Sequence, residues 1–324
     1  MARKVSEASQ PGSPHKSFRR SYREDYVREL NVPGIMQHIF TTFKMIFENW
    51  RLFLPLLGLA VVLAIVLVGL MSQATYEQFG IMLDQIANES GEELGGFAKS
   101  GLLLLSTITT GGLAMEAGES VAVFGVLIFL MLWLTTIFIL RHKMAKHELK
   151  LRDALYNAMT PLLSTLAVFV VAVIQCIPIF ILIIAYSAAV QTDFLATPFY
   201  ALMFLVFAGL MILLSSYLLS SSIIALVAVS APGLYPMVAL RTASELMVGR
   251  RIRFVIRLIA LIVVLIIMWV VVMIPLIWFD LGMKNFDWAV NIPFIPFCLV
   301  AMTCFTGIYS TVYLYIYYRW LLDN

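Results

Sequence analysis

Six long stretches without a single charged residue constrain this chain more than any other feature. They cover residues 52–71, 121–140, 162–189, 199–230, 258–279 and 292–318, and none contains Asp, Glu, Lys, Arg or His. A helix needs about 20 apolar residues to cross the hydrocarbon core of a bilayer. Each stretch reaches that length, and together they make up nearly half of the 324 residues. We therefore expect the chain to cross a membrane six times.

The spans are expected to be helices, because lipid offers no hydrogen bonds to an exposed backbone. Strands of a membrane barrel would alternate polar and apolar residues, whereas these stretches are continuously apolar. Only 13% of the residues are charged and 61% are hydrophobic, and a soluble chain carries about 25% charge. The predicted fold class is all-α, a polytopic transmembrane bundle of six spans.

The basic residues predict the orientation. All but two of the 22 Lys and Arg residues lie in residues 1–51, 141–161, 231–257 or 319–324, and the exceptions are Lys99 and Lys284. By the positive-inside rule, both termini are expected to be cytoplasmic. The expected location is a bacterial-type cytoplasmic membrane. Residues 72–120 then form an outer loop, and residues 1–33, rich in Ser, Pro and basic side chains, form a disordered cytoplasmic tail.

An amphipathic segment precedes spans one, three and five. In residues 34–51, Phe40, Phe43 and Phe47 recur at helical spacing, while Lys44 and Glu48 fall on the other side, together with His38. Such a helix lies in the membrane interface with its apolar face at acyl depth. The segments before spans three and five have the same period, with Leu151, Leu155 and Met159 in one and Leu240, Ala243 and Met247 in the other. The chain thus consists of three similar units, each an amphipathic helix followed by an outgoing span, a loop and a returning span. The alternative is that any even number of spans can be divided into hairpins.

Two stretches of this sequence resemble a known family. They are Pro236-Met-Val-Ala-Leu-Arg-Thr-Ala-Ser-Glu-Leu-Met-Val-Gly-Arg-Arg251 and Phe43-Lys-Met-Ile-Phe-Glu-Asn-Trp-Arg-Leu-Phe53. Both look like parts of the six-span membrane domain attached to some glycerophosphoryl diester phosphodiesterases, and of related stand-alone proteins of unknown function. The resemblance implies a membrane module over residues 34–320. The polar segments are too short for the roughly 250 residues of a catalytic barrel, so no catalytic residue is carried over.

A direct search for chemistry gives little. His142 and His147 do not share a face of a continuous helix as a zinc-binding pair would, and His15 and His38 stand alone. We interpret them as interfacial histidines and expect no metal and no cofactor. No nucleotide-binding or hydrolase motif is found, so an enzyme is the third-ranked function.

The densest basic cluster lies just before span five. It consists of Arg250, Arg251, Arg253 and Arg257. These side chains are candidates for contact with anionic lipid headgroups, since each cation near a charged leaflet contributes about 1 kcal/mol. The alternative is that they only fix topology. Nucleic acid is not an expected partner, because the cluster lies beside a span and lacks interleaved aromatic residues.

Polar residues inside the spans are uncharged. Gln175, Ser216, Ser220, Thr303 and Ser310 are candidates for helix packing or for a polar path. Gln175 together with Pro178 is also expected to interrupt span three. The absence of charge in the spans argues against an ion-coupled carrier.

The leading functional hypothesis is a non-enzymatic module that organises membrane lipids or envelope components. Its expected partners are membrane lipids, with other envelope proteins or self-association as further candidates. The alternative is a transporter or lipid translocator with a cavity between spans three, four and six.

Overall fold

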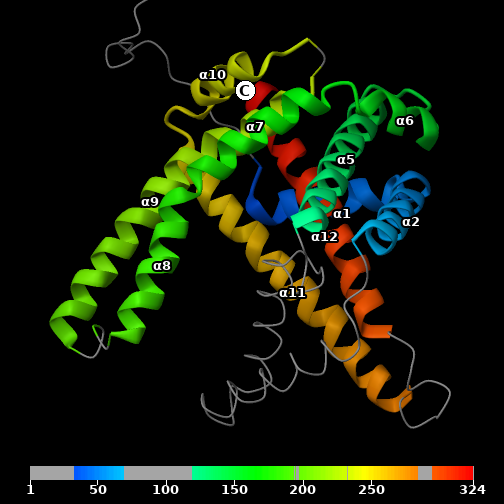
Figure 1. Ribbon diagram of the computed structural model, residues 1–324. Coiled ribbons are helices and arrows are strands. Elements are labelled where there is room, and N and C mark those ends of the chain that lie inside the picture. Colours follow the sequence, from blue (N-terminus) through cyan, green and yellow to red (C-terminus); the bar gives the residue numbers. More distant parts are fainter. Residues whose placement is uncertain are drawn as a thin grey trace, which may run out of the picture.

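The computed structural model describes residues 33–68, 119–192, 194, 197–231, 233–283 and 294–323. Within these residues every regular element is helical, and six helical segments are long and apolar enough to cross a membrane (Figure 1). The all-α, six-span prediction is confirmed. The predicted tail and most of the predicted outer loop lie outside the described residues.

The six spans agree with the apolar stretches in the sequence. They are α2 (Trp50–Leu67), α5 (Glu119–Met144), α7 (Leu162–Gln175) with α8 (Ile177–Gln191), α9 (Pro198–Ala228), α11 (Arg251–Met283) and α12 (Phe294–Asp323). The last two helices and α5 extend beyond the uncharged stretches. Charged residues at a helix end reach water or headgroups with their long side chains, so the helix continues past the apolar run.

Span three is interrupted at Cys176, where α7 ends and α8 begins. Pro178 lacks the backbone N–H that would continue the hydrogen-bond ladder, and its ring clashes with the preceding turn. The predicted interruption is confirmed. Span four is bonded to the break, because the Ser222 hydroxyl donates to Gln175 Oε1 at 2.6 Å and the Ser215 hydroxyl donates to the Gln175 carbonyl at 3.1 Å.

Three amphipathic helices precede spans one, three and five, as predicted. They are α1 (Ile35–Glu48), α6 (Leu151–Ala158) and α10 (Pro236–Met247). Each buries residues spaced four apart, which places one narrow stripe of the helix against the bundle. The stripes consist of His38, Thr42 and Ile46 in α1, Ala154 and Ala158 in α6, and Ala239, Ala243 and Met247 in α10.

The three helices follow one rule of packing. Each lies on both spans of the preceding unit: α6 packs against α5 and α2, and α10 packs against α9 and α7. Since no unit precedes the first, α1 packs against α12 and α11, the spans of the last unit. The arrangement is therefore cyclic, and α1 completes it.

The spans repeat the same cyclic pattern. The first span of each unit packs against the second span of its own unit and against the second span of the unit before it. These contacts are α2 with α5 and α12, α7 with α9 and α5, and α11 with α12 and α9. The even-numbered spans also contact one another, and the Trp133 indole of α5 donates to the Leu226 carbonyl of α9 at 3.4 Å. This pattern does not follow from an even number of spans, so it supports a true repeat.

One hairpin leaves the bundle. The break at Cys176 directs α8 and the first half of α9 away from the other spans, as Figure 1 shows at its lower left. Large apolar side chains along this hairpin are uncovered, among them Ile184, Leu205 and Leu213. An apolar surface of this kind is suited to lipid or to contact with another membrane protein.

Candidate functional site

The amphipathic helices and the basic residues share one end of the bundle. An even number of spans separates α1, α6 and α10, so the three helices lie on one side of the six crossings. The end of α12 belongs to the same side, because the Trp320 ring lies 4.4 Å from the His38 ring of α1. This end is the candidate functional site.

The structure divides the arginine cluster before span five. Arg253 is exposed, whereas Arg250 and Arg257 are buried, at 3% and 8% exposure. Arg251 lies with its guanidinium 3.7 Å above the Tyr217 ring and donates to the Tyr217 carbonyl at 3.1 Å. Cation–π contact and the hydrogen bond tie α11 to α9. Of the four candidates for lipid contact, Arg253 is the side chain that the fold leaves open.

The Arg257 guanidinium lies in a buried cluster that the sequence did not reveal. It donates to His38 Nδ1 at 3.2 Å and to the Pro33 carbonyl at 2.6 Å. It also faces the Tyr317 ring, 5.1 Å from the ring centre. The Tyr313 hydroxyl donates to the Arg257 carbonyl at 3.0 Å. The cluster therefore joins α1, α11 and α12.

His38 is fully buried at the centre of this cluster. Its ring stacks on that of Tyr313 at 3.8 Å, and Nε2 lies 3.0 Å from the Tyr313 carbonyl. Because a carbonyl only accepts, Nε2 carries the proton and Nδ1 accepts from Arg257. Burial lowers the pKa of His38 to about 3, the bond to the Tyr313 carbonyl opposes this shift, and the positive charge of Arg257 adds to it. His38 is therefore neutral.

The interpretation of His38 as an isolated interfacial histidine is wrong. The sequence pattern assigned it to the wet side of α1, whereas the structure packs it against the bundle together with Thr42 and Ile46. Phe40 and Phe47 are each 68% exposed on other sides of the helix. The burial of His38 could have been predicted by comparing the amphipathic helices of the different units. His38, Thr42 and Ile46 have the same spacing as Ala239, Ala243 and Met247.

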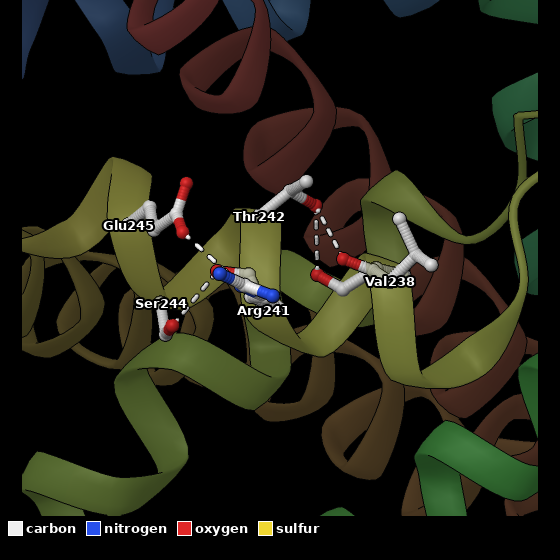
Figure 2. Close-up of polar contacts among 6 residues, drawn as sticks. Val238, Arg241, Thr242, Ser244 and Glu245 are labelled. Carbon is white, nitrogen blue, oxygen red and sulfur yellow. Dashed lines mark hydrogen bonds and ion pairs between the residues drawn. The ribbon is translucent and has the colours of Figure 1, made fainter. Parts of the chain in front are cut away.

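The outer side of α10 is polar and satisfies its own hydrogen bonds. Figure 2 shows Arg241 next to Glu245, with Nε and Oε1 3.4 Å apart, and the Ser244 hydroxyl donating to the Arg241 carbonyl. The Thr242 hydroxyl donates in the same way to the carbonyl of Val238. The Arg241 side chain is 70% exposed and that of Glu245 is 49% exposed, so this face is turned away from the bundle.

Some polar residues of the spans bond to neighbouring helices, and others bond within their own helix. Ser220 and Thr303 donate to carbonyls of their own helices, and Ser216 and Ser310 are half-buried. Gln175 bonds α7 to α9 as described above. The Trp269 indole of α11 donates to the Thr306 hydroxyl of α12 at 2.9 Å. The two interhelical contacts, of Gln175 and of Trp269, are typical of polar groups that hold membrane helices together.

His142 and His147 lie closer together than the sequence predicted. Their ring centres are 6.3 Å apart, because α5 ends at Met144 and the chain turns back through Lys146 at φ 58°. Among the described residues, no third His, Cys, Asp or Glu joins any such pair to form a metal-binding group.

Searches against protein-family models, curated proteins and solved structures find no match to this chain.

Proposed function

We propose that this protein is a non-enzymatic membrane module that organises membrane lipids or envelope components. In this proposal it contacts anionic headgroups through the end of the bundle that carries α1, α6 and α10. In the same proposal that end is the cytoplasmic one, which the distribution of Lys and Arg supports, and the membrane is a bacterial-type cytoplasmic membrane. The resemblance to the membrane domain of certain phosphodiesterases supports a module without a catalytic barrel.

One observation carries the proposal: each amphipathic helix presents uncovered apolar side chains beside exposed cations. In α1, Phe40 and Phe47 are exposed near Lys44. In α6, the Tyr156 side chain is exposed and Arg152 is 93% exposed, and in α10 Met237 is exposed near Arg241. Apolar residues that enter the acyl boundary beside cations that meet anionic headgroups are the properties of an interfacial helix.

The alternative remains a transporter or lipid translocator. Three hydroxyls of spans four and six bond to neighbouring helices, which favours packing at those places: Ser215 and Ser222 bond to Gln175, and Thr306 accepts from Trp269. A fluorescent-lipid flipping assay in protein-containing vesicles separates the two. The module leaves flipping at the rate of protein-free vesicles, whereas a translocator accelerates it.

Lipid contact is tested with spin-labelled lipids. Protein reconstituted in phosphatidylcholine vesicles should immobilise spin-labelled phosphatidylglycerol in preference to phosphatidylcholine. The double variant Arg152→Gln with Arg253→Gln should reduce this preference, by about fivefold for each cation that contributes ~1 kcal/mol. The double variant Lys99→Gln with Lys284→Gln is the matched control, because it removes the same charge from segments assigned to the opposite side. Equal effects of the two variants would contradict the proposal.

A further inference from the structure

A pocket of about 590 Å³ lies between α5, α6 and the turn that leads into α7. It opens at the end of the bundle that carries the amphipathic helices, and its volume is that of a typical small-ligand site. Its walls come from the last turns of α5, the connection to α6, the end of α6, and Ser230 beyond α9. Neither the membrane-module hypothesis nor the transporter hypothesis assigns a function to this pocket.

Three basic side chains line the pocket: Arg141, His142 and His147. His142 Nδ1 lies 3.0 Å from the Phe138 carbonyl, so Nδ1 carries a proton, and Nε2 can donate to an anion only in the imidazolium form, in which both ring nitrogens are protonated. The His142 ring also lies 4.1 Å from the Phe138 ring, which holds its orientation. None of the described residues that line the pocket is acidic. The rim is therefore suited to an anion.

The chain brings these groups together by ending α5 with a reversal. Lys146 adopts the left-handed conformation, and the His147 amide donates to the His142 carbonyl at 3.0 Å. His147 consequently returns to the side of His142 instead of continuing along the helix. The backbone reversal that brings His147 back to His142 therefore depends only on contacts within this short segment.

The remaining lining has two parts. Asn157 supplies a neutral amide donor, and Leu134, Ile137 and Phe138 form an apolar wall. The Thr160 and Ser230 hydroxyls also line the pocket, but they donate to the carbonyls of Asn157 and Val227. The planar fork of an arginine matches two oxygens of a phosphate, and an amide N–H2 can donate to a third. An apolar wall beside such a rim fits a ligand whose phosphate is attached to an apolar part.

We infer that this pocket binds a phosphate group carried by an amphiphile, and that the ligand is the headgroup of an anionic phospholipid with its acyl chains in the bilayer. The inference rests on the proposed lipid contact and deepens it, because it assigns one headgroup to one place. Arg141 is the principal phosphate ligand, and His142 and His147 complete the basic rim. Free soluble phosphates share the same chemistry and are the other source that the experiment distinguishes.

The test uses the full chain in phosphatidylcholine nanodiscs with a photoactivatable phosphatidic acid whose reactive group lies near the headgroup. Cross-links should map to residues 134–147 and 157–161, and unlabelled phosphatidic acid should compete. Arg141→Gln should weaken binding about tenfold or more, which is the usual effect of losing a charged hydrogen-bond partner. Lys143→Gln is the matched control, because it removes a neighbouring charge from the same helix without touching the pocket lining.

The outcomes separate this inference from the proposed function. Loss of cross-linking in Arg141→Gln but not in Lys143→Gln, with unchanged melting of both variants, supports the pocket. Competition by glycerol 3-phosphate as strong as that by phosphatidic acid would identify a soluble phosphate as the ligand and overturn the assignment to a lipid. Equal cross-linking of both variants would overturn the pocket altogether. The spin-label preference for phosphatidylglycerol would then still report on the proposed function, which fails only if that preference is absent.

Discussion

The ring of His38 lies 3.8 Å from that of Tyr313 and nearly parallel to it, at an angle of 13°. The two residues are 275 positions apart. This contact packs α1 against α12. Arg257 of α11 donates a hydrogen bond to Nδ1 of the same His38 imidazole. The cyclic arrangement of the three units is therefore joined by one neutral histidine.

Replacing His38 with Ala should destabilise the protein by about 2–4 kcal/mol. The change leaves a cavity, and it removes partners from the Tyr313 carbonyl and from the buried Arg257 guanidinium. Unfolding in detergent micelles measures the loss. Gln37→Ala is the control, because the neighbouring Gln37 is exposed and its loss should stay within about 0.5 kcal/mol. Similar unfolding of the two variants would show that the cluster does not hold α1.

Acidification should weaken the same contact. The pKa of His38 is lowered from 6.5 to about 3 in the folded protein. The unfolded chain therefore takes up a proton first, so the stabilising effect is complete above about pH 6.5 and is lost as the pH falls towards 3. The slope is at most about 1.4 kcal/mol per pH unit. Unfolding of the wild type and of His38→Gln is compared across this range, and the variant should lack this part of the slope.

The hydrogen bond between Gln175 and Ser222 should contribute a small coupling energy. We expect about 0.6 kcal/mol from a double-mutant cycle of Gln175→Leu and Ser222→Ala, and no more than about 1.7 kcal/mol, as for other membrane helices. Ser216→Ala in combination with Gln175→Leu is the matched control and should show no coupling. Coupling of equal size in both cycles would mean that the effect is general loosening of α7 and α9.

A spin-label scan along α1 should show a helical period with a definite phase. Labels at His38, Thr42 and Ile46 should be the least accessible to lipid and water, because these positions face the bundle. Labels at Phe40 and Phe47 should be accessible to lipid-soluble relaxants. Uniform exposure to water along the scan would show that α1 is a linker and not an interfacial helix.

Cysteines introduced at Glu92 and Lys146 should react with an impermeant thiol reagent from opposite sides of the membrane. The expectation follows from the distribution of Lys and Arg, which assigns Glu92 to the outer side. Glu92 lies outside the described residues, and Lys146 lies in the exposed turn after α5. Replacing the three native cysteines by Ser or Ala gives the background for labelling. Reaction of both positions from one side would overturn the orientation.

The spans and the amphipathic helices could be predicted because their signals are local. About 20 apolar residues identify a span, and a period of 3.6 identifies an amphipathic helix. The break at Cys176 was predictable from Pro178 for the same reason. Each of these features depends on neighbours in the chain alone.

The buried cluster could not be predicted in this way. His38 is polar, so periodicity assigned it to the wet face, and its burial depends on Arg257 and Tyr313, which lie far away in the sequence. His147 was misplaced because the end of α5 at Met144 carries no clear stop signal, and continued helix was assumed. In both cases the position of the histidine depends on a contact with a residue that only the folded chain brings close to it.

The place of α1 in the cyclic arrangement also sets an order of assembly. As the chain is synthesised, α6 and α10 each follow the two spans on which they pack, so their sites exist when they emerge. α1 precedes all six spans and its site on α11 and α12 is made last. The residues of α1 that are buried in the complete fold have no partner on α12 until that helix is made. Bringing α1 to α12 closes a loop that contains the rest of the chain, which costs a few kcal/mol of chain entropy. A chain that ends before α12 would therefore lack the helix against which α1 mainly packs, whereas α6 and α10 would keep both of the spans on which they lie.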